Sequence, residues 1–305
     1  MNNLPDSPDT MARLLARQHY IASDPIAMAL YLACQLQKPL LVEGPPGVGK
    51  TELAKAAATA LGLPMLRLQC YEGLDEAKAL YEWKYGKQLL YTQILKEQLD
   101  DILSGSHGLD GAMEKLHSVD DLFFSERFVE PRPLLKALRQ PEGAVLLIDE
   151  VDKSDEEFEA LLLEVLSDYQ VSIPELGTLV AQTIPVVILT SNNSRELSDA
   201  LKRRCLHLYI PFPGIEQEIA ILRARVPDIA AQLAGQLATF VERLRELELK
   251  KQPAISETLD WARALLLLHA NSLDPELVRT TLNVLLKHAE DIDNVNSQLK
   301  ELLTD

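Results

Sequence analysis

Five mainly apolar runs mark the first two thirds of the chain, and segments with helical patterns separate them. The runs cover residues 40–43, 65–70, 144–148, 185–190 and 206–210. Most of them are continuously apolar, which is typical of strands that are buried on both faces of a parallel sheet. Because strands and helices alternate, we expect an α/β fold with a parallel five-stranded sheet covered by helices on both sides.

The composition changes after residues 213–214, where only helical patterns follow. These patterns cover residues 218–226, 229–249, 257–269 and 276–303, with Pro227, Pro253 and Pro275 between them. The pattern predicts two domains, an α/β core over residues 1–213 and an all-helical lid over residues 214–305.

Two insertions interrupt the strand and helix pattern, at residues 71–143 and 169–181. In the first, residues 81–87 alternate aromatic and charged side chains and predict a small hairpin or exposed loop that turns at Gly86. Trp83 and Tyr85 either contact a partner or pack on a helix at 89–103. Residues 104–111, rich in glycine and serine, predict a flexible loop. The second insertion predicts a β-hairpin just before the fourth run.

A glycine-rich segment follows the first predicted strand. Residues 44–51 read Gly-Pro-Pro-Gly-Val-Gly-Lys-Thr and match the pattern G-x-x-x-x-G-K-[ST]. Glycines allow backbone angles that turn N–H groups toward an anion, and the positive end of the helix predicted next points at the same place. Lys50 is expected to reach the β and γ phosphates of ATP. The predicted nucleotide-binding residues are Gly44, Pro45, Pro46, Gly47, Val48, Gly49, Lys50, Thr51, Glu52 and Asp149.

Polar residues end two of the buried runs, where open α/β sheets bind ligands. Asp149 and Glu150 follow the third run, and Asn192 follows the fourth. Thr51 and Asp149 are expected to hold Mg²⁺, directly or through water, because a hard cation prefers oxygen ligands. Glu150 is expected to polarise the attacking water, and Asn192 to orient that water or contact the γ phosphate. Gln69, near the end of the second run, is placed to point toward the nucleotide.

The alternative for Asp149 and Glu150 is that they cap the helix that follows them. Residues 154–157 read Ser-Asp-Glu-Glu and resemble a capping box, with Ser154 as the better cap. We therefore favour the catalytic interpretation of the two acids.

A basic segment, residues 199–205, precedes the last predicted strand. It reads Asp-Ala-Leu-Lys-Arg-Arg-Cys. An arginine supplied to the phosphates of a neighbouring subunit accelerates hydrolysis about 10³- to 10⁵-fold. Arg204 is our first candidate for this arginine finger and Arg203 the second, with a surface salt bridge as the alternative for either.

The composition excludes several classes of protein. The chain has 46 acidic and 30 basic residues, a formal charge of -16, which argues against a broad electrostatic grip on nucleic acid or on an anionic membrane. No run approaches the roughly 18 apolar residues of a membrane span. The 3 cysteines form no C-x-x-C pair, which suggests neither a zinc site nor a disulfide framework and fits a cytoplasmic protein.

Together these features resemble an AAA+ ATPase, with a phosphate-loop NTPase core and a helical lid. The insert at the second helix and the hairpin before the Asn192 strand resemble the MoxR branch, and within it the CoxD-like subgroup, accessory ATPases of carbon monoxide dehydrogenase and related molybdenum hydroxylases. The segments that carry the likeness are residues 67–74, 79–83, 146–153, 190–192, 203–205 and 257–261.

The resemblance implies a ring, typically a hexamer, with ATP at the interfaces between subunits. It also implies a partner with a von Willebrand factor A domain and a chaperone activity that remodels or metallates a protein client. One position departs from the branch, which commonly has a sensor arginine early in the third lid helix. Thr258 stands there, and Arg263 lies about one turn further on.

We therefore expect a ring-forming ATPase that remodels a protein client, such as a molybdenum hydroxylase during maturation. One rival is a nucleotide-gated scaffold with little turnover. Another is a nucleic-acid motor, which the acidic charge and the absence of a basic cluster in either insertion argue against.

Overall fold

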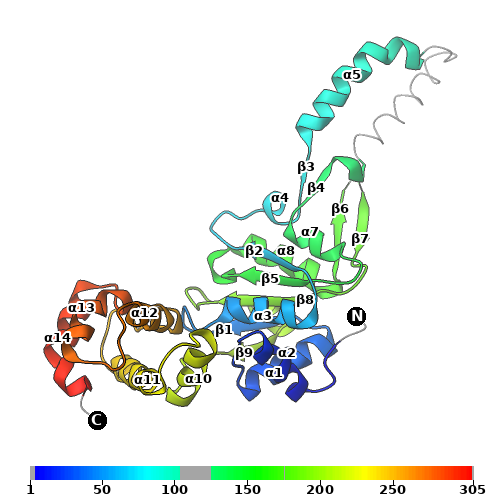
Figure 1. Ribbon diagram of the computed structural model, residues 1–305. Helices are drawn as coiled ribbons and strands as arrows, with labels where there is room; N and C mark the ends of the chain where they lie inside the picture. The colour runs from blue at the N-terminus through cyan, green and yellow to red at the C-terminus, as the bar shows by residue number, and fades with distance from the viewer. Residues whose placement is uncertain (1–3, 104–124, 175, 304–305) are drawn as a thin grey trace.

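A sheet of five parallel strands lies at the centre of the computed structural model, which describes residues 4–103, 125–174 and 176–303 (Figure 1). The strands are arranged in the order β2-β5-β8-β1-β9. They are β1 (Leu40–Glu43), β2 (Met65–Gln69), β5 (Val145–Asp149), β8 (Val186–Ser191) and β9 (Leu206–Tyr209). Each of these strands matches a predicted run to within one residue at its end, and all pairings in this sheet are parallel, so the predicted α/β sheet is confirmed.

Helices cover both faces of the sheet because successive side chains of a strand point to opposite sides. In β5, Val145 and Leu147 pack in one hydrophobic cluster, and Leu146 and Ile148 pack in another. The first cluster is completed by α1 (Pro8–Arg17), α2 (Asp24–Leu36) and α3 (Lys50–Leu61). The second is completed by α7 (Pro133–Leu138), α8 (Glu156–Asp168) and α9 (Asp199–Arg204).

Helix α5 (Tyr85–Leu103) of the first insertion projects from the core as an arm (Figure 1). The described elements of this insertion are α4 (Glu76–Ala79), β3 (Tyr81–Trp83), α5, the short 3₁₀ helix η1 (Glu126–Phe128), β4 (Val129–Pro131) and the core-packed helix α7. The hairpin predicted to turn at Gly86 is wrong, because Gly86 lies in α5 and β3 pairs antiparallel with β4. Local alternation of side chains does not reveal a partner strand so distant in sequence. The loop predicted at 104–111 lies outside the described residues.

Trp83 and Tyr85 have different surroundings. Trp83 packs against the hydrophobic cluster of the core, and its ring meets that of Tyr81 edge to face at 6.1 Å. Tyr85 is 68% exposed at the start of α5. Trp83 therefore packs within its own chain, but the neighbour that the structure gives it is the core cluster, whereas the predicted neighbour was the helix at 89–103.

The second insertion is an antiparallel hairpin of β6 (Gln170–Ile173) and β7 (Gly177–Val180). Val171 and Ile173 point into the core cluster, while their neighbour Ser172 is exposed. The hairpin predicted at 169–181 is confirmed.

Five helices follow β9 and pack around a third hydrophobic cluster of their own. They are α10 (Ile215–Arg225), α11 (Ala231–Glu246), α12 (Ile255–Leu267), α13 (Pro275–Leu285) and α14 (Ala289–Leu303). The single helix predicted at 276–303 is wrong, because the chain turns at residues 286–288 and both pieces bury apolar side chains in this cluster. The proposed domain boundary falls in the connection between β9 and α10. No helix in the described ranges combines the length and apolar character needed to cross a bilayer.

Candidate functional site

The glycine-rich loop joins the end of β1 to the start of α3, and two of its glycines have backbone positions that other residues fit poorly. Gly44 has a φ of 150°, and a Cβ atom there would lie 2.2 Å from the carbonyl oxygen of Ile210. Gly47 has a φ of 77°, and its Cβ would lie 2.5 Å from that of Ala254, which precedes lid helix α12. The loop is therefore held between the last strand and the lid.

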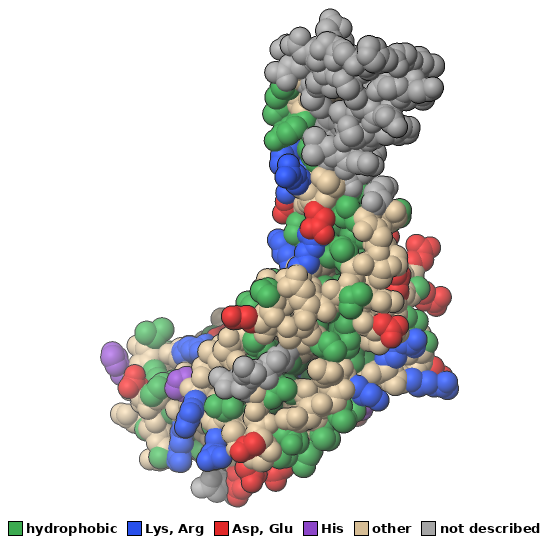
Figure 2. All heavy atoms as spheres, turned by 90° about the vertical axis from the view of Figure 1, so that its right-hand side faces the viewer, with side chains coloured by type: hydrophobic (Ala, Val, Ile, Leu, Met, Phe, Trp, Pro, Cys, Tyr) green, Lys and Arg blue, Asp and Glu red, His purple; other side chains and the backbone are tan. Residues whose placement is uncertain are grey.

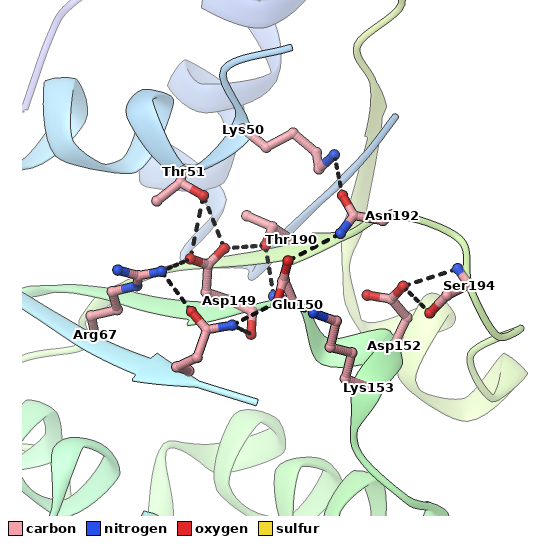
Figure 3. A network of polar contacts seen from close by, with 11 residues as sticks. Lys50, Thr51, Arg67, Asp149, Glu150, Asp152, Lys153, Thr190, Asn192 and Ser194 are labelled. Carbon is pink, nitrogen blue, oxygen red and sulfur yellow. Dashed lines mark hydrogen bonds and ion pairs between the residues drawn. The ribbon is translucent and has the colours of Figure 1, made fainter. Parts of the chain in front are cut away.

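Lys50, the first residue of α3, is buried and its ammonium group lies within the loop (Figure 3). Its Nζ donates to the carbonyl oxygens of Gly44 at 2.7 Å and Pro45 at 2.8 Å, and to Oδ1 of Asn192 at 2.8 Å. The pKa of Lys50 is lowered, because burial disfavours the charged form more than the neighbouring carboxylates favour it. The structure thus brings the loop lysine and the end of β8 together.

Asp149 ends β5 and is almost completely buried. Its Oδ1 accepts hydrogen bonds from Thr51 Oγ1 at 3.0 Å and Thr190 Oγ1 at 2.6 Å. Its Oδ2 lies 2.6 Å from Nη2 of Arg67. A hydroxyl oxygen and a carboxylate therefore lie side by side, and this set of oxygen donors fits Mg²⁺, which commonly uses one or two carboxylates together with substrate phosphates.

Glu150 has a left-handed backbone with a φ of 56°, which turns its side chain out of the sheet. Its backbone N–H donates to Thr190 Oγ1 at 2.9 Å. Its Oε1 accepts from Nδ2 of Asn192 at 3.3 Å, and its Oε2 from Gln69 at 2.8 Å and Lys153 at 2.6 Å. The Asn192 amide thus bridges Lys50 and Glu150 (Figure 3). Gln69 contacts Glu150 from the other side of the carboxylate, at Oε2.

Neither acid caps helix α8, and Glu150, which precedes the short 3₁₀ helix η2 (Val151–Lys153), makes no side-chain capping bond to it. The N-cap of α8 is Asp155, whose carboxylate accepts from the N–H of Phe158 at 2.9 Å. Ser154 donates to the carbonyl of Val151 in η2, so its prediction as the cap is wrong. Asp149 and Glu150 are therefore available to a ligand.

A polar pocket of about 250 Å³ collects these groups. It is lined by Pro46, Gly47, Gly49, Lys50, Thr51, Glu52, Asp149, Glu150, Thr190, Asn192 and Ser256. Of the other predicted nucleotide-binding residues, Gly44 and Pro45 contact Lys50 through their carbonyl oxygens, and Val48 is buried below the loop. Ser256 near the start of α12 and Thr190 in β8 were not predicted.

A second cavity of about 200 Å³ adjoins the loop and is mainly apolar. Tyr20 and Ile21 line it from the N-terminal side, Ile210 from the end of β9, and Ile221 and Leu259 from the lid. This cavity could not be predicted from the sequence, because its walls come from three distant segments. Arg225 of α10 closes one side and forms an ion pair with Glu52 at 2.9 Å.

Arg203 and Arg204 lie outside both cavities of their own chain. Nε of Arg204 donates to Ser167 Oγ at the end of α8 at 2.7 Å, and both arginine side chains are exposed. The structure does not bring them to the phosphate loop, and a role toward a neighbouring subunit stays a prediction.

The two candidates for a sensor in the lid also lie outside the pockets. Thr258 is fully buried and its hydroxyl donates to the carbonyl of Ala254 at 3.2 Å. Arg263 pairs with Asp260 at 3.0 Å on an exposed face. Ser256 is the lid residue that lines the polar pocket beside the phosphate loop.

The contact between loop and lid gives a test of this geometry. Gly47→Ala is expected to destabilise the protein by more than the roughly 1–2 kcal/mol of a left-handed alanine, because its Cβ would also collide with Ala254 and Ser256. Gly62→Ala is the matched control, with a φ of 67° and no atom within 4 Å of the added Cβ. Denaturant unfolding measures both, and equal losses in the free energy of unfolding would contradict the predicted contact.

Comparison with known proteins identifies the family. The model of the AAA domain (dynein-related subfamily) matches residues 39–205, which is more than half of the chain. An uncharacterized protein of Staphylococcus epidermidis is 26% identical over 239 residues, covering 76% of this chain and 77% of the relative. One from Staphylococcus haemolyticus is 26% identical over 265 residues, covering 83% and 85%. The RuvB Holliday junction branch migration motor of Thermotoga maritima aligns over 92% of this chain and 72% of its own, with 19% identity and a TM-score of 0.45. On the family match, the chain belongs to the AAA domain family, in its dynein-related subfamily.

Proposed function

We propose that this AAA protein is a ring-forming ATPase that hydrolyses ATP to remodel a protein client. One observation carries the proposal: the Asn192 amide contacts both Lys50 and Glu150 in the polar pocket. This places a cation suited to phosphate, a polar group suited to orienting water and a carboxylate suited to accepting a proton within one pocket.

Each residue of the polar pocket has a separate role in the proposed reaction. Lys50 binds the β and γ phosphates, and the oxygens of Thr51 and Asp149 hold Mg²⁺, which neutralises phosphate charge when bound. Glu150 accepts a proton as water attacks the γ phosphorus and the bond to ADP breaks, so ATP and water yield ADP and phosphate. The adjoining cavity suits the adenine base, because it offers apolar walls beside the loop.

The branch within the family follows from the two insertions. The insert at 71–143 and the hairpin at 169–181 support membership of the MoxR branch, and the segments at 67–74 and 79–83 support its CoxD-like subgroup. On this basis we propose a hexamer in the cytoplasm, a partner with a von Willebrand factor A domain, and a molybdenum hydroxylase or a related carbon monoxide dehydrogenase as client. The assignment would be supported if a tagged chain co-purifies with these proteins and loses them when ATP is removed. A chain that stays monomeric in the presence of ATP would contradict it.

A scaffold that binds ATP and turns it over rarely is the second candidate. The contacts of Glu150 with Gln69, Lys153 and Asn192 favour it, because these three donors already occupy both oxygens of the carboxylate that would have to meet the attacking water. Turnover by the purified ring with its partner separates the two. A rate equal to that of a Glu150→Gln ring would favour the scaffold.

The projecting arm is the surface we assign to the client or partner. Tyr85, Leu89, Leu90, Tyr91 and Ile94 of α5 are 40–68% exposed. Figure 2 shows hydrophobic side chains beside basic ones on the described part of this arm. Exposed aromatic and aliphatic side chains that contribute little to their own fold are typical of contact surfaces between proteins.

Leu89→Asp is expected to leave basal ATP turnover unchanged and to remove stimulation by the client or partner. The reason is that Leu89 is 62% exposed on α5, and a carboxylate there opposes burial in an interface. Leu267→Asp is the matched control, since Leu267 is 80% exposed at the end of lid helix α12. Steady-state ATPase assays with and without partner provide the measurement. Normal stimulation of the Leu89 variant would remove α5 from the contact surface.

A further inference from the structure

Arg67 in β2 contacts the carboxylate of the predicted metal site. Its Nη2 lies 2.6 Å from Oδ2 of Asp149 and 2.5 Å from Oε1 of Gln69 (Figure 3). The Arg67 side chain is 47% exposed, whereas that of Asp149 is 3% exposed. A half-exposed cation is therefore paired with a buried anion.

A divalent cation and Arg67 require the same carboxylate. Thr51 and Thr190 already donate to Oδ1 of Asp149, and Arg67 provides the positive charge at Oδ2. Two cations within a few ångströms repel each other, and only one negative charge is present on Asp149 to offset them. A metal ion bound beside Thr51 would therefore weaken the contact between Arg67 and Asp149.

The contact also reaches Glu150. Because Arg67 donates to the amide oxygen of Gln69, it orients that amide with its nitrogen toward Glu150 Oε2 at 2.8 Å. The Arg67 guanidinium thereby links Asp149, the predicted metal ligand, to Gln69. Gln69 in turn holds Glu150, the proposed base. Loss of the Arg67 contact removes the donor that fixes the Gln69 amide.

We propose that Arg67 is an internal competitor for the divalent cation at Asp149, and that metal binding displaces it and loosens the hold of Gln69 on Glu150. The inference rests on the proposed nucleotide site and adds a positioning residue to it. Arg67 then sets how much free metal the site requires, and couples metal loading to the freedom of Glu150.

The backbone pairing of Arg67 does not involve its side chain. Arg67 lies on β2, an edge strand of the sheet, and its backbone pairs with Leu147 of β5. Arg67→Gln removes the charge and leaves these backbone bonds intact. The metal affinity of a folded variant can therefore be measured.

Direct Mn²⁺ binding to the full-length, nucleotide-free protein tests the proposal, with free Mn²⁺ followed by electron paramagnetic resonance. Arg67→Gln is expected to bind Mn²⁺ about three- to tenfold more tightly than the unmodified chain, because a competing charge is gone. Arg67→Lys retains the charge and is expected to bind less tightly than Arg67→Gln. Arg139→Gln, at a site where the arginine pairs with Glu126 outside the pocket, is expected to match the unmodified chain.

Each contrary outcome has a distinct meaning. Equal or weaker Mn²⁺ binding by Arg67→Gln would overturn the proposal, as would tighter binding that persists when Asp149→Asn is added. Absence of Mn²⁺ binding in all variants would contradict the competition at Asp149 as well. Because no turnover is required, a protein that binds the ion as expected and hydrolyses no ATP would refute the proposed function alone.

Discussion

Arg204→Ala is expected to lower ATP turnover by the assembled ring about 10³- to 10⁵-fold while leaving nucleotide affinity mostly unchanged. Arg204 lies outside the pockets of its own chain and contacts Ser167 and Ala200 at the end of α8 and in α9. An arginine so placed does not line the pocket of its own chain, and because it is exposed we propose that it acts on the phosphates of a neighbouring subunit. Steady-state turnover and equilibrium nucleotide binding measure the two properties separately.

Arg203→Ala is the matched control for this prediction. Arg203 is the adjacent arginine of α9 and is also exposed, but it is our second candidate. We expect it to reduce turnover much less than Arg204→Ala. If the Arg204→Ala ring hydrolyses ATP normally and the Arg203→Ala ring does not, Arg203 is the arginine finger. If both rings hydrolyse ATP normally, neither arginine of α9 is the finger.

Glu150→Gln is expected to reduce turnover about 10²- to 10⁴-fold, because the amide no longer accepts a proton from the attacking water. Retained or tighter ATP binding is expected, since the phosphate contacts that we propose for Lys50 and Thr51 do not involve this side chain. Single-turnover hydrolysis with radiolabelled ATP measures the chemical step without product release.

Asp152→Asn is the matched control for Glu150→Gln. Asp152 lies two residues further on and accepts from the N–H and hydroxyl of Ser194, so it supports the loop after β8 and does not line the pocket. A decrease in the chemical step much smaller than that of Glu150→Gln is expected. A Glu150→Gln ring with an unchanged chemical step would mean that another group accepts the proton.

The sequence predicted the parts of the fold and site that depend on short-range patterns. Asp149 ends β5, Asn192 directly follows β8, and Lys50 follows the loop after β1. Parallel strands bring their carboxyl ends to one edge of a sheet. The structure places these three residues in one polar pocket, as that rule requires. The hairpin at 169–181 was also found, because both of its strands and its turn are local.

The parts that the sequence did not predict depend on contacts between distant segments. The pairing of β3 with β4 joins residues 81–83 to residues 129–131, which lie far apart in the sequence. The turn between α13 and α14 at residues 286–288 contains neither glycine nor proline. The apolar cavity is built from the N-terminal segment, the end of β9 and the lid. Arg67 appears as an ordinary strand residue until β2 and β5 are aligned, which sets Gln69 opposite Asp149.

A mixture of two inactive variants tests the interface site most directly. Lys50→Ala cannot bind the phosphates properly but keeps Arg204, and Arg204→Ala keeps an intact pocket but lacks the finger. In mixed rings, some interfaces combine the intact Lys50 of one subunit with the intact Arg204 of its neighbour. We expect ATP turnover to be nearly absent for each variant alone and to return when the two are mixed. A mixture as inactive as its components, in rings shown to exchange subunits, would contradict a site that two subunits share.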